Sequence, residues 1–115
     1  MEINGKELNF SLFNEDDVGM KKRYFEKLEE MAHVRDALPD GTEQKKNKYL
    51  CDRIKDMFDY VFGEGVGASV CGQGNDLLVH LEAYDQLVSE QIRQQERYER
   101  VMSKLKGFQK KAGKK

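Results

Sequence analysis

The chain has 115 residues, of which 38% are hydrophobic and 36% charged, with a formal net charge of −1. This length suits one domain with a thin core, and the near-zero net charge gives no global attraction to nucleic acid or an anionic membrane. No apolar run approaches the ~20 residues of a membrane-spanning helix, so we expect no membrane partner. The start of the chain lacks the basic and apolar regions of a signal peptide, which predicts an interior compartment with reduced thiols.

The charge is distributed unevenly along the chain. Residues 1–40 carry a net charge of −4, residues 41–92 again −4, and residues 93–115 carry two acidic and nine basic residues, net +7. A block of like charge at one end is typical of a solvated tail or an electrostatic arm. We therefore predict a single helical domain over residues 1–106, which includes an N-terminal hairpin, followed by a basic flexible tail over residues 107–115.

The first twelve residues predict a β-hairpin. Asn4 and Gly5 favour the two positive-φ positions of a type I′ turn. After the turn, Leu8, Phe10 and Leu12 alternate with polar residues and would make one apolar face. So short a ribbon is marginal alone, and we expect it to rest on a helix or to extend a sheet between copies of the chain.

Two helices are predicted next, over about residues 14–38 and 43–62. Asn14 and the acids that follow it indicate the first helix start, and Pro39 disfavours a helical residue before it. Thr42 is the expected N-cap of the second helix, and Gly63 its expected end. At about 100° per residue the second helix has one apolar face, formed by Leu50, Cys51, Ile54, Met57, Phe58 and Val61.

Residues 63–74 hold five glycines and could be a phosphate-binding loop or a tight connection. A dinucleotide-binding loop follows a strand, whereas this segment follows a helix, and it lacks the Gly-Lys-Ser/Thr ending of a P-loop. We therefore interpret it as a connection with a short helical turn over residues 66–71.

A third main helix is predicted over about residues 76–106. Its first half has an apolar stripe formed by Leu77, Leu81, Tyr84, Val88 and Ile92. Five polar residues follow at 93–97, and the apolar side chains then resume, turned by roughly 90° about the helix axis. These are Tyr98, Val101, Met102 and Leu105. The turned stripe predicts contact with the first helix, a second copy or another protein, although a helix end projecting into solvent would show the same pattern.

No catalytic, cofactor or metal site is indicated. Cys51, Cys71, His33 and His80 are spaced unlike any zinc finger or ribbon. No serine or cysteine lies in a recognisable nucleophile signature, and the carboxylate pairs at i, i+3 are typical of solvated helix faces. We therefore expect a non-enzymatic protein without cofactor or metal, of mainly α fold with a small N-terminal β-hairpin (α+β).

Two stretches nevertheless resemble a known group. The opening segment Met1–Phe10, with its Ile-Asn-Gly-Lys turn, resembles the hairpin that opens many small proteins of Firmicutes phages and prophages. The segment Phe58–Gly65, followed by Gly72, Asn75 and Leu81–Tyr84, is similar to small uncharacterised phage proteins of the tail module. The likeness covers residues 1 to about 90 and does not extend to the lysine-rich end.

This resemblance implies a role like that of a phage tail assembly chaperone, in the cytoplasm of the bacterial host. Such a protein self-associates and holds a helical partner such as the tape-measure protein or another tail protein. Seven apolar residues are the expected contacts, namely Tyr98, Val101, Met102 and Leu105 of the last helix and Leu8, Phe10 and Leu12 of the hairpin. The alternatives are a virion structural or connector subunit and a small nucleic-acid-binding regulator that uses the basic C-terminal segment.

Overall fold

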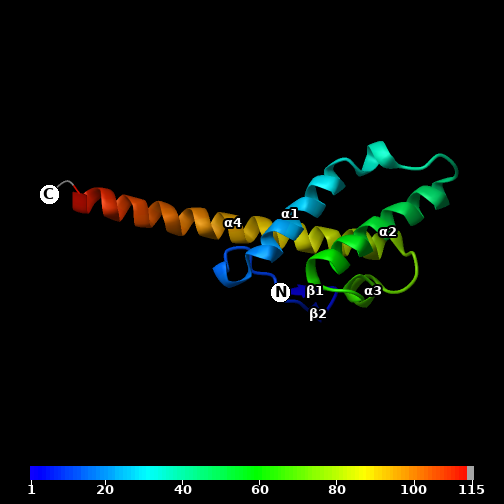
Figure 1. Cartoon of the computed structure of the whole chain (residues 1–115), viewed down its shortest axis with the longest axis horizontal. Coiled ribbons are helices and arrows are strands. Elements are labelled where there is room, and N and C mark those ends of the chain that lie inside the picture. The colour runs from blue at the N-terminus through cyan, green and yellow to red at the C-terminus, as the bar shows by residue number, and fades with distance from the viewer. Residues whose placement is uncertain (114–115) are drawn as a thin grey trace.

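The computed structural model describes the backbone of residues 1–113 and the side chains of residues 1–107. It contains a two-stranded antiparallel sheet and four α-helices, three of them long (Figure 1), so the expected mainly α fold with a small β-hairpin is confirmed. The elements are β1 (Glu2–Ile3), β2 (Lys6–Glu7), η1 (Glu15–Asp17), α1 (Val18–Ala32), η2 (Val34–Ala37), α2 (Glu43–Phe62), α3 (Val66–Cys71) and α4 (Leu77–Gly113).

The hairpin forms around the expected turn. Asn4 and Gly5 both have positive φ, at 49° and 82°, and Ile3 pairs with Lys6. The second strand ends at Glu7, and the chain beyond it packs against the core instead of continuing the strand pairing. Phe10 and Leu12 are buried there, so they do not present an apolar strand edge.

The predicted first helix is three helical pieces, since α1 lies between the short 3-10 helices η1 and η2. The Asn14 side chain accepts a hydrogen bond from the backbone of Asp16, and Asp17 then caps α1. Leu38 is extended, with ψ at 136°, as its position before Pro39 requires. Tyr24 is the fully buried residue of α1.

Helices α2 and α3 pack at very short range. The bounds of α2 agree with the sequence because Thr42 caps its start and Gly63 ends it with a φ of 128°. The expected short helix over residues 66–71 is also present. A Cβ on Gly67 would lie only 2.5 Å from the Lys55 carbonyl oxygen, so glycine permits this approach. The N-cap of α3 is Gly65, and the Asp59 side chain of α2 accepts a hydrogen bond at 2.7 Å from the Gly67 amide in the first turn of α3.

Helix α4 begins where Asp76 accepts from the Val79 amide, and it runs through the body and beyond it (Figure 1). The molecule measures 68 × 29 × 22 Å, and the projecting half of α4 supplies much of its length. Gly107 does not end the helix, which continues to Gly113. The predicted flexible tail therefore coincides, as far as residue 113, with the end of α4, while residues 114–115 lie outside the described part.

The predicted core face of α4 is wrong in direction, although Tyr84 of that face packs half-buried against the core. Leu81 and Ile92 are 45% and 47% exposed, whereas the buried residues are His80, Ala83, Leu87 and Gln91. Small Ala83 allows close packing, and Gln91 accepts a hydrogen bond from Tyr24 of α1. One ring nitrogen of His80 contacts the Asp76 carbonyl oxygen at the start of α4 itself, and the other has no partner in the described part of the chain. The core itself consists of Ile3, Phe10, Leu12, Tyr24, Ile54, Met57, Phe58, Val61, Val70, Cys71, Ala83 and Leu87.

Candidate protein-binding surface

The side of α4 that packs into the body continues as an apolar row along the projecting arm. At 3.6 residues per turn, the buried α4 residues and the four arm residues lie within roughly 60° of one direction. We call these four residues the distal row: Tyr98, Val101, Met102 and Leu105. The expected rotation of this row is therefore wrong, because it was measured from the wrong core face.

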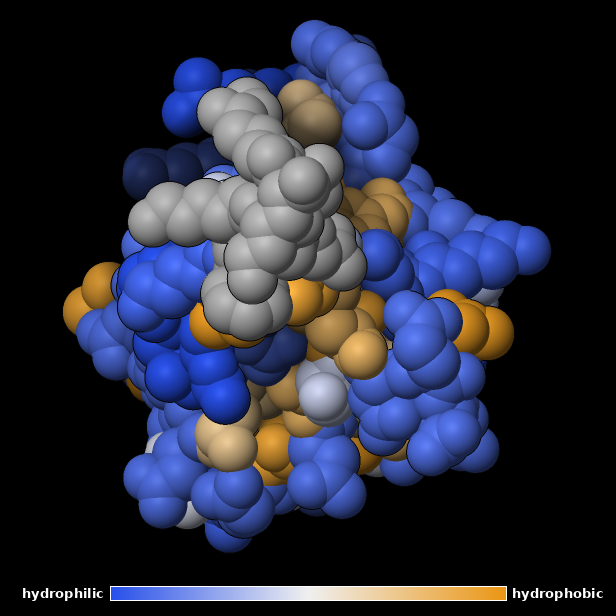
Figure 2. Space-filling model, turned by 90° about the vertical axis from the view of Figure 1, so that its left-hand side faces the viewer, coloured by the Kyte–Doolittle hydropathy of each residue, from blue (hydrophilic) through white to orange (hydrophobic). Residues whose placement is uncertain are grey.

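The distal row is largely uncovered by the described part of the chain. Tyr98, Val101 and Leu105 are 44%, 55% and 46% exposed, and Met102 is half-buried. Figure 2 views the molecule from the end at which α4 projects, and apolar surface appears there among hydrophilic side chains. Four apolar side chains in succession on a projecting helix form one continuous apolar surface, which isolated exposed residues would not.

The N-terminal segment forms the inner end of this surface. The ring of Phe13 stacks on that of Tyr98, with the centroids 4.3 Å apart and the planes 4° from parallel. The ammonium group of Lys21, a residue of α1, lies 4.9 Å from the centroid of the Phe13 ring. Beside this stack is an open groove of about 550 Å³, which Phe10, Gln94 and Val101 help to line. The distal row thus starts in a shallow groove and continues onto an open helix.

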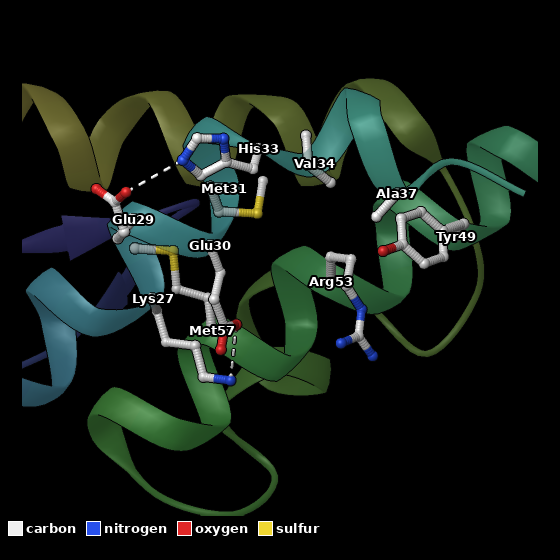
Figure 3. A pocket seen from close by; sticks show the side chains of 10 residues that line it. All are labelled: Lys27, Glu29, Glu30, Met31, His33, Val34, Ala37, Tyr49, Arg53 and Met57. Atoms are coloured by element: carbon white, nitrogen blue, oxygen red, sulfur yellow. Dashed lines mark hydrogen bonds and ion pairs between the residues drawn. The ribbon is translucent and has the colours of Figure 1, made fainter.

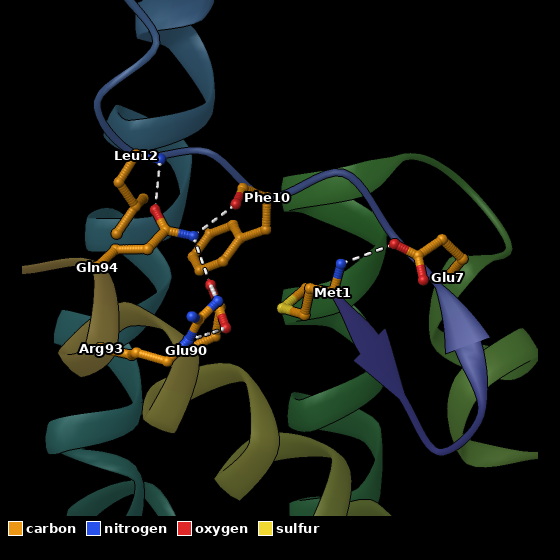
Figure 4. A network of polar contacts seen from close by, with 7 residues as sticks. All are labelled: Met1, Glu7, Phe10, Leu12, Glu90, Arg93 and Gln94. Atoms are coloured by element: carbon orange, nitrogen blue, oxygen red, sulfur yellow. Dashed lines mark hydrogen bonds and ion pairs between the residues drawn. The ribbon is translucent and has the colours of Figure 1, made fainter. Parts of the chain in front are cut away.

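Gln94 fixes the segment that forms this groove (Figure 4). Its amide nitrogen donates to the Phe10 carbonyl oxygen at 2.6 Å and to Glu90 at 2.8 Å, and its oxygen accepts from the Leu12 amide at 2.9 Å. Glu90 also pairs with Arg93 at 2.8 Å. One polar side chain of α4 therefore satisfies two backbone groups of a segment that has no strand partner there.

Two further glutamines of α4 bind the N-terminal half in the same manner. The Gln86 oxygen accepts from the Asn4 backbone amide at 2.7 Å, and its amide donates to the Asn4 side chain at 2.9 Å. Gln91 accepts from the Tyr24 hydroxyl at 2.6 Å. Burial, followed by the negative charge that Tyr84 would carry, raises the pKa of Tyr24 well above its usual range, so the hydroxyl stays a donor. These contacts leave no local signal in the sequence, because each partner lies over sixty residues away.

The flank of the arm is basic. Arg97, Arg100 and Lys104 lie on one side of the helix, and none forms an ion pair with another residue of the described part. They are exposed, so their charges act mainly by steering an acidic partner and are weakened by salt. The surface therefore combines an apolar row with a positively charged edge.

The three hairpin residues expected to contact a partner lie elsewhere. Phe10 is 6% exposed and Leu12 3% exposed, both within the core, and Leu8 is half-buried against it. The structure thus brings Phe10 close to the distal row through the groove, but it leaves Leu12 no access to a partner. The open part of the surface is the distal row and Phe13.

A second hollow, of about 470 Å³, lies between the end of α1, η2 and α2 (Figure 3). Met31 and Met57 contribute apolar lining, and Lys27 pairs with Glu30 and with Asp56 at 2.8 Å. The hydrogen bond to Asp56 raises the pKa of Lys27. Because the rim mixes both charge signs at short range, it offers no net field to a charged ligand.

The residues considered for chemistry do not assemble into a site in the described part of the chain. His80 is fully buried, with Nδ1 2.6 Å from the Asp76 carbonyl oxygen. His33 is exposed just after the end of α1, with its ring beside Glu29. Cys51 and Cys71 are free and buried, and burial raises the pKa of the Cys71 thiol to about 11. Such a thiol is not a ready nucleophile. Among the described residues no group of three or more metal-binding side chains occurs, and no helix is long and apolar enough to cross a membrane.

The fold and this surface define a small α-helical protein with an N-terminal hairpin and an apolar helical arm. The chain belongs to a family of unknown function, DUF6673, whose sequence pattern matches residues 4–115. No curated protein and no solved structure matches the chain.

Proposed function

We propose that this protein is a non-enzymatic assembly protein that holds a helical partner along the distal row. The observation that carries the proposal is the continuation of the core face of α4 beyond the body, where Val101 and Leu105 are about half exposed. A partner helix with apolar residues at i, i+3, i+4 and i+7 would bury this row as α-helices commonly do. The basic flank favours a partner whose helix is acidic beside its apolar face.

The resemblance of the hairpin and of residues 58–84 to phage tail-module proteins suggests which assembly this is. We propose a tail assembly chaperone-like role in the cytoplasm of the bacterial host, with the tape-measure protein or another helical tail protein as the partner. A chaperone of this kind needs no catalytic residue. It needs an apolar surface that covers a long helix reversibly, and the exposed distal row supplies such a surface.

The proposal can be tested by co-expressing the chain with fragments of the tape-measure protein of the same phage. The wild-type chain is expected to keep the fragments soluble and to co-purify with them. Val101→Glu and Leu105→Glu should abolish both effects, because each buries a charge in the interface. Ser103→Glu is the matched control, since it adds the same charge on the opposite side of the arm, where Ser103 is exposed.

The proposal would be contradicted if all three variants retained the fragments. It would also be contradicted if neither the wild type nor any variant retained them. Mass spectrometry of purified virions separates the roles: a chaperone is absent from the particle, whereas a structural or connector subunit is present.

The exposed row of Arg97, Arg100 and Lys104 favours nucleic-acid binding as a second candidate. That candidate predicts DNA or RNA binding that weakens steeply with salt and is lost in Arg97→Ala/Arg100→Ala.

A further inference from the structure

A second apolar row lies on the outer side of α4, within the body half of the helix. We call it the outer row: Leu78, Leu81, Val88 and Ile92. Leu78 is 64% exposed, and only Val88 is half-buried. The proposed function does not use the outer row. At 3.6 residues per turn, the outer row points roughly 130° away from the distal row, so the two rows face different sides of one helix.

The two rows differ in charge as well as direction. Between Leu77 and Ile92 the helix carries Glu82, Asp85 and Glu90 and no lysine or arginine. Asp85 lies within the outer row and Glu82 at its edge, whereas the distal row is flanked by Arg97, Arg100 and Lys104. The same contrast holds for the whole chain, since residues 1–92 have a net charge of −8 and residues 93–115 of +7. Each copy therefore presents an acidic apolar row and a basic apolar row.

We propose that the outer row is the docking site for the arm of a second copy of this chain. The proposal shares with the proposed function only the use of the distal row, which would contact either a partner helix or the next copy. Burial of both apolar rows drives the contact, and the opposite charges select this pairing. Pairing two distal rows would bring basic flanks together, and pairing two outer rows would place Asp85 opposite Asp85.

The direction of the second copy follows from the body. The distal row faces the same side of α4 as the buried residues, so the docked copy lies in line with the first body. An antiparallel α4 would drive its own arm into the segment that carries Phe10 and Phe13. A parallel α4, displaced by about 23 residues or ~35 Å, avoids this clash and sets Val101 over Leu78 and Leu105 over Leu81.

Such a contact is heterologous and does not close on itself. Each copy uses its arm toward one neighbour and its outer row toward the other, so copies add in one direction with a repeat of ~35 Å. The described contact covers only about two helical turns. The surface area it buries is therefore smaller than the ~1,200 Å² that a stable interface buries. Association is therefore weak, rises with concentration and falls with added salt.

The test is the mass of the full chain by light scattering over a range of concentrations at low salt. The wild type and Ser103→Glu are expected to increase in mass with concentration. Leu81→Glu and Val101→Glu should each remain monomeric, because each breaks one half of the contact. Both replaced side chains are about half exposed, so circular dichroism should show the fold unchanged.

An equimolar mixture of the two variants is the decisive sample. Leu81→Glu keeps an intact arm and Val101→Glu an intact outer row, so the mixture should form a heterodimer and nothing larger. A monomeric wild type at the highest soluble concentration would overturn the proposal. So would continued self-association of Leu81→Glu alone, or a mixture that stays monomeric.

Failure here is distinguishable from failure of the proposed function. Leu81→Glu leaves the distal row untouched, so it should still keep the tape-measure fragments soluble. If the wild type is monomeric and yet retains the fragments, the self-docking proposal fails alone. If it assembles and retains nothing, the proposed function fails alone.

Discussion

Truncation of Gln94 to alanine tests whether the polar contacts of α4 hold the N-terminal segment. The change leaves the Phe10 carbonyl oxygen and the Leu12 amide without their partner, whose contacts are 2.6 and 2.9 Å long. An unpaired buried group costs about 1–3 kcal/mol, and these two are only partly buried. Taking the lower end for each, we expect the free energy of unfolding to fall by about 2 kcal/mol.

Urea unfolding measures this loss. With a slope near 1.5 kcal/mol/M, a 2 kcal/mol loss moves the midpoint down by about 1.3 M while the slope stays unchanged. Gln73→Ala is the control, because the side chain of Gln73 is exposed and only its backbone carbonyl accepts a hydrogen bond, from Lys55. A Gln94→Ala midpoint equal to that of the control would refute the reasoning that this side chain anchors the segment.

The same variant should also weaken the binding surface without altering the distal row. Once Phe10 and Leu12 are released, Phe13 loses the backbone position from which it stacks on Tyr98. We therefore expect Gln94→Ala to retain fewer tape-measure fragments than the wild type at temperatures where both are folded. Equal retention would mean that Phe13 takes no part in holding the partner.

Two further predictions concern the α2–α3 contact and the buried thiol. Gly67→Ala should lower the free energy of unfolding by about 2 kcal/mol in urea titrations, because its Cβ would overlap the Lys55 backbone. Gly107→Ala, with nothing within 4 Å, should raise it by up to about 1 kcal/mol. Because Cys71 has a pKa of about 11 when folded and 9.0 as a free thiol, the unfolded chain loses its proton first. Stability should therefore fall as pH rises from 9 to 11, by on the order of 2–3 kcal/mol, and less in Cys71→Ala.

Local signals in the sequence were sufficient for much of the fold. Thr42 and Gly63 mark both ends of α2, and Asn4 and Gly5 specify the hairpin turn, because each acts within its own turn of backbone. The short helix α3 follows from its flanking glycines. Such features depend on few neighbours and are therefore readable in one sequence.

The buried face of α4 could not be found in this way. Leu78, Leu81 and Ile92 are more hydrophobic than His80, Ala83 and Gln91, so a count of apolar residues selects the exposed side. The polar residues are buried because Tyr24 and the Asp76 carbonyl pair with them, and the first of these is distant in sequence. Long-range pairing of this kind leaves no periodic signal.

The candidate site was predicted in part. The four residues of the distal row were identified because apolar residues at helical spacing resume after the polar residues 93–97, but Phe13 and Gln94 were not. Phe13 is a single aromatic residue before a helix start, and its value comes from the stack on Tyr98 eighty-five positions later. Nothing in the sequence indicates that these two rings lie next to each other in the fold.

Helix α4 is a single unbroken element from the centre of the body to the tip of the arm. Its inner half is fixed at three points by Gln86, Gln91 and Gln94, so the arm keeps one orientation relative to the globule. A partner helix of the kind proposed would therefore meet a surface whose position on the body is already fixed. Little rotational freedom remains to be lost on capture, and a short contact can hold better than its area alone would indicate.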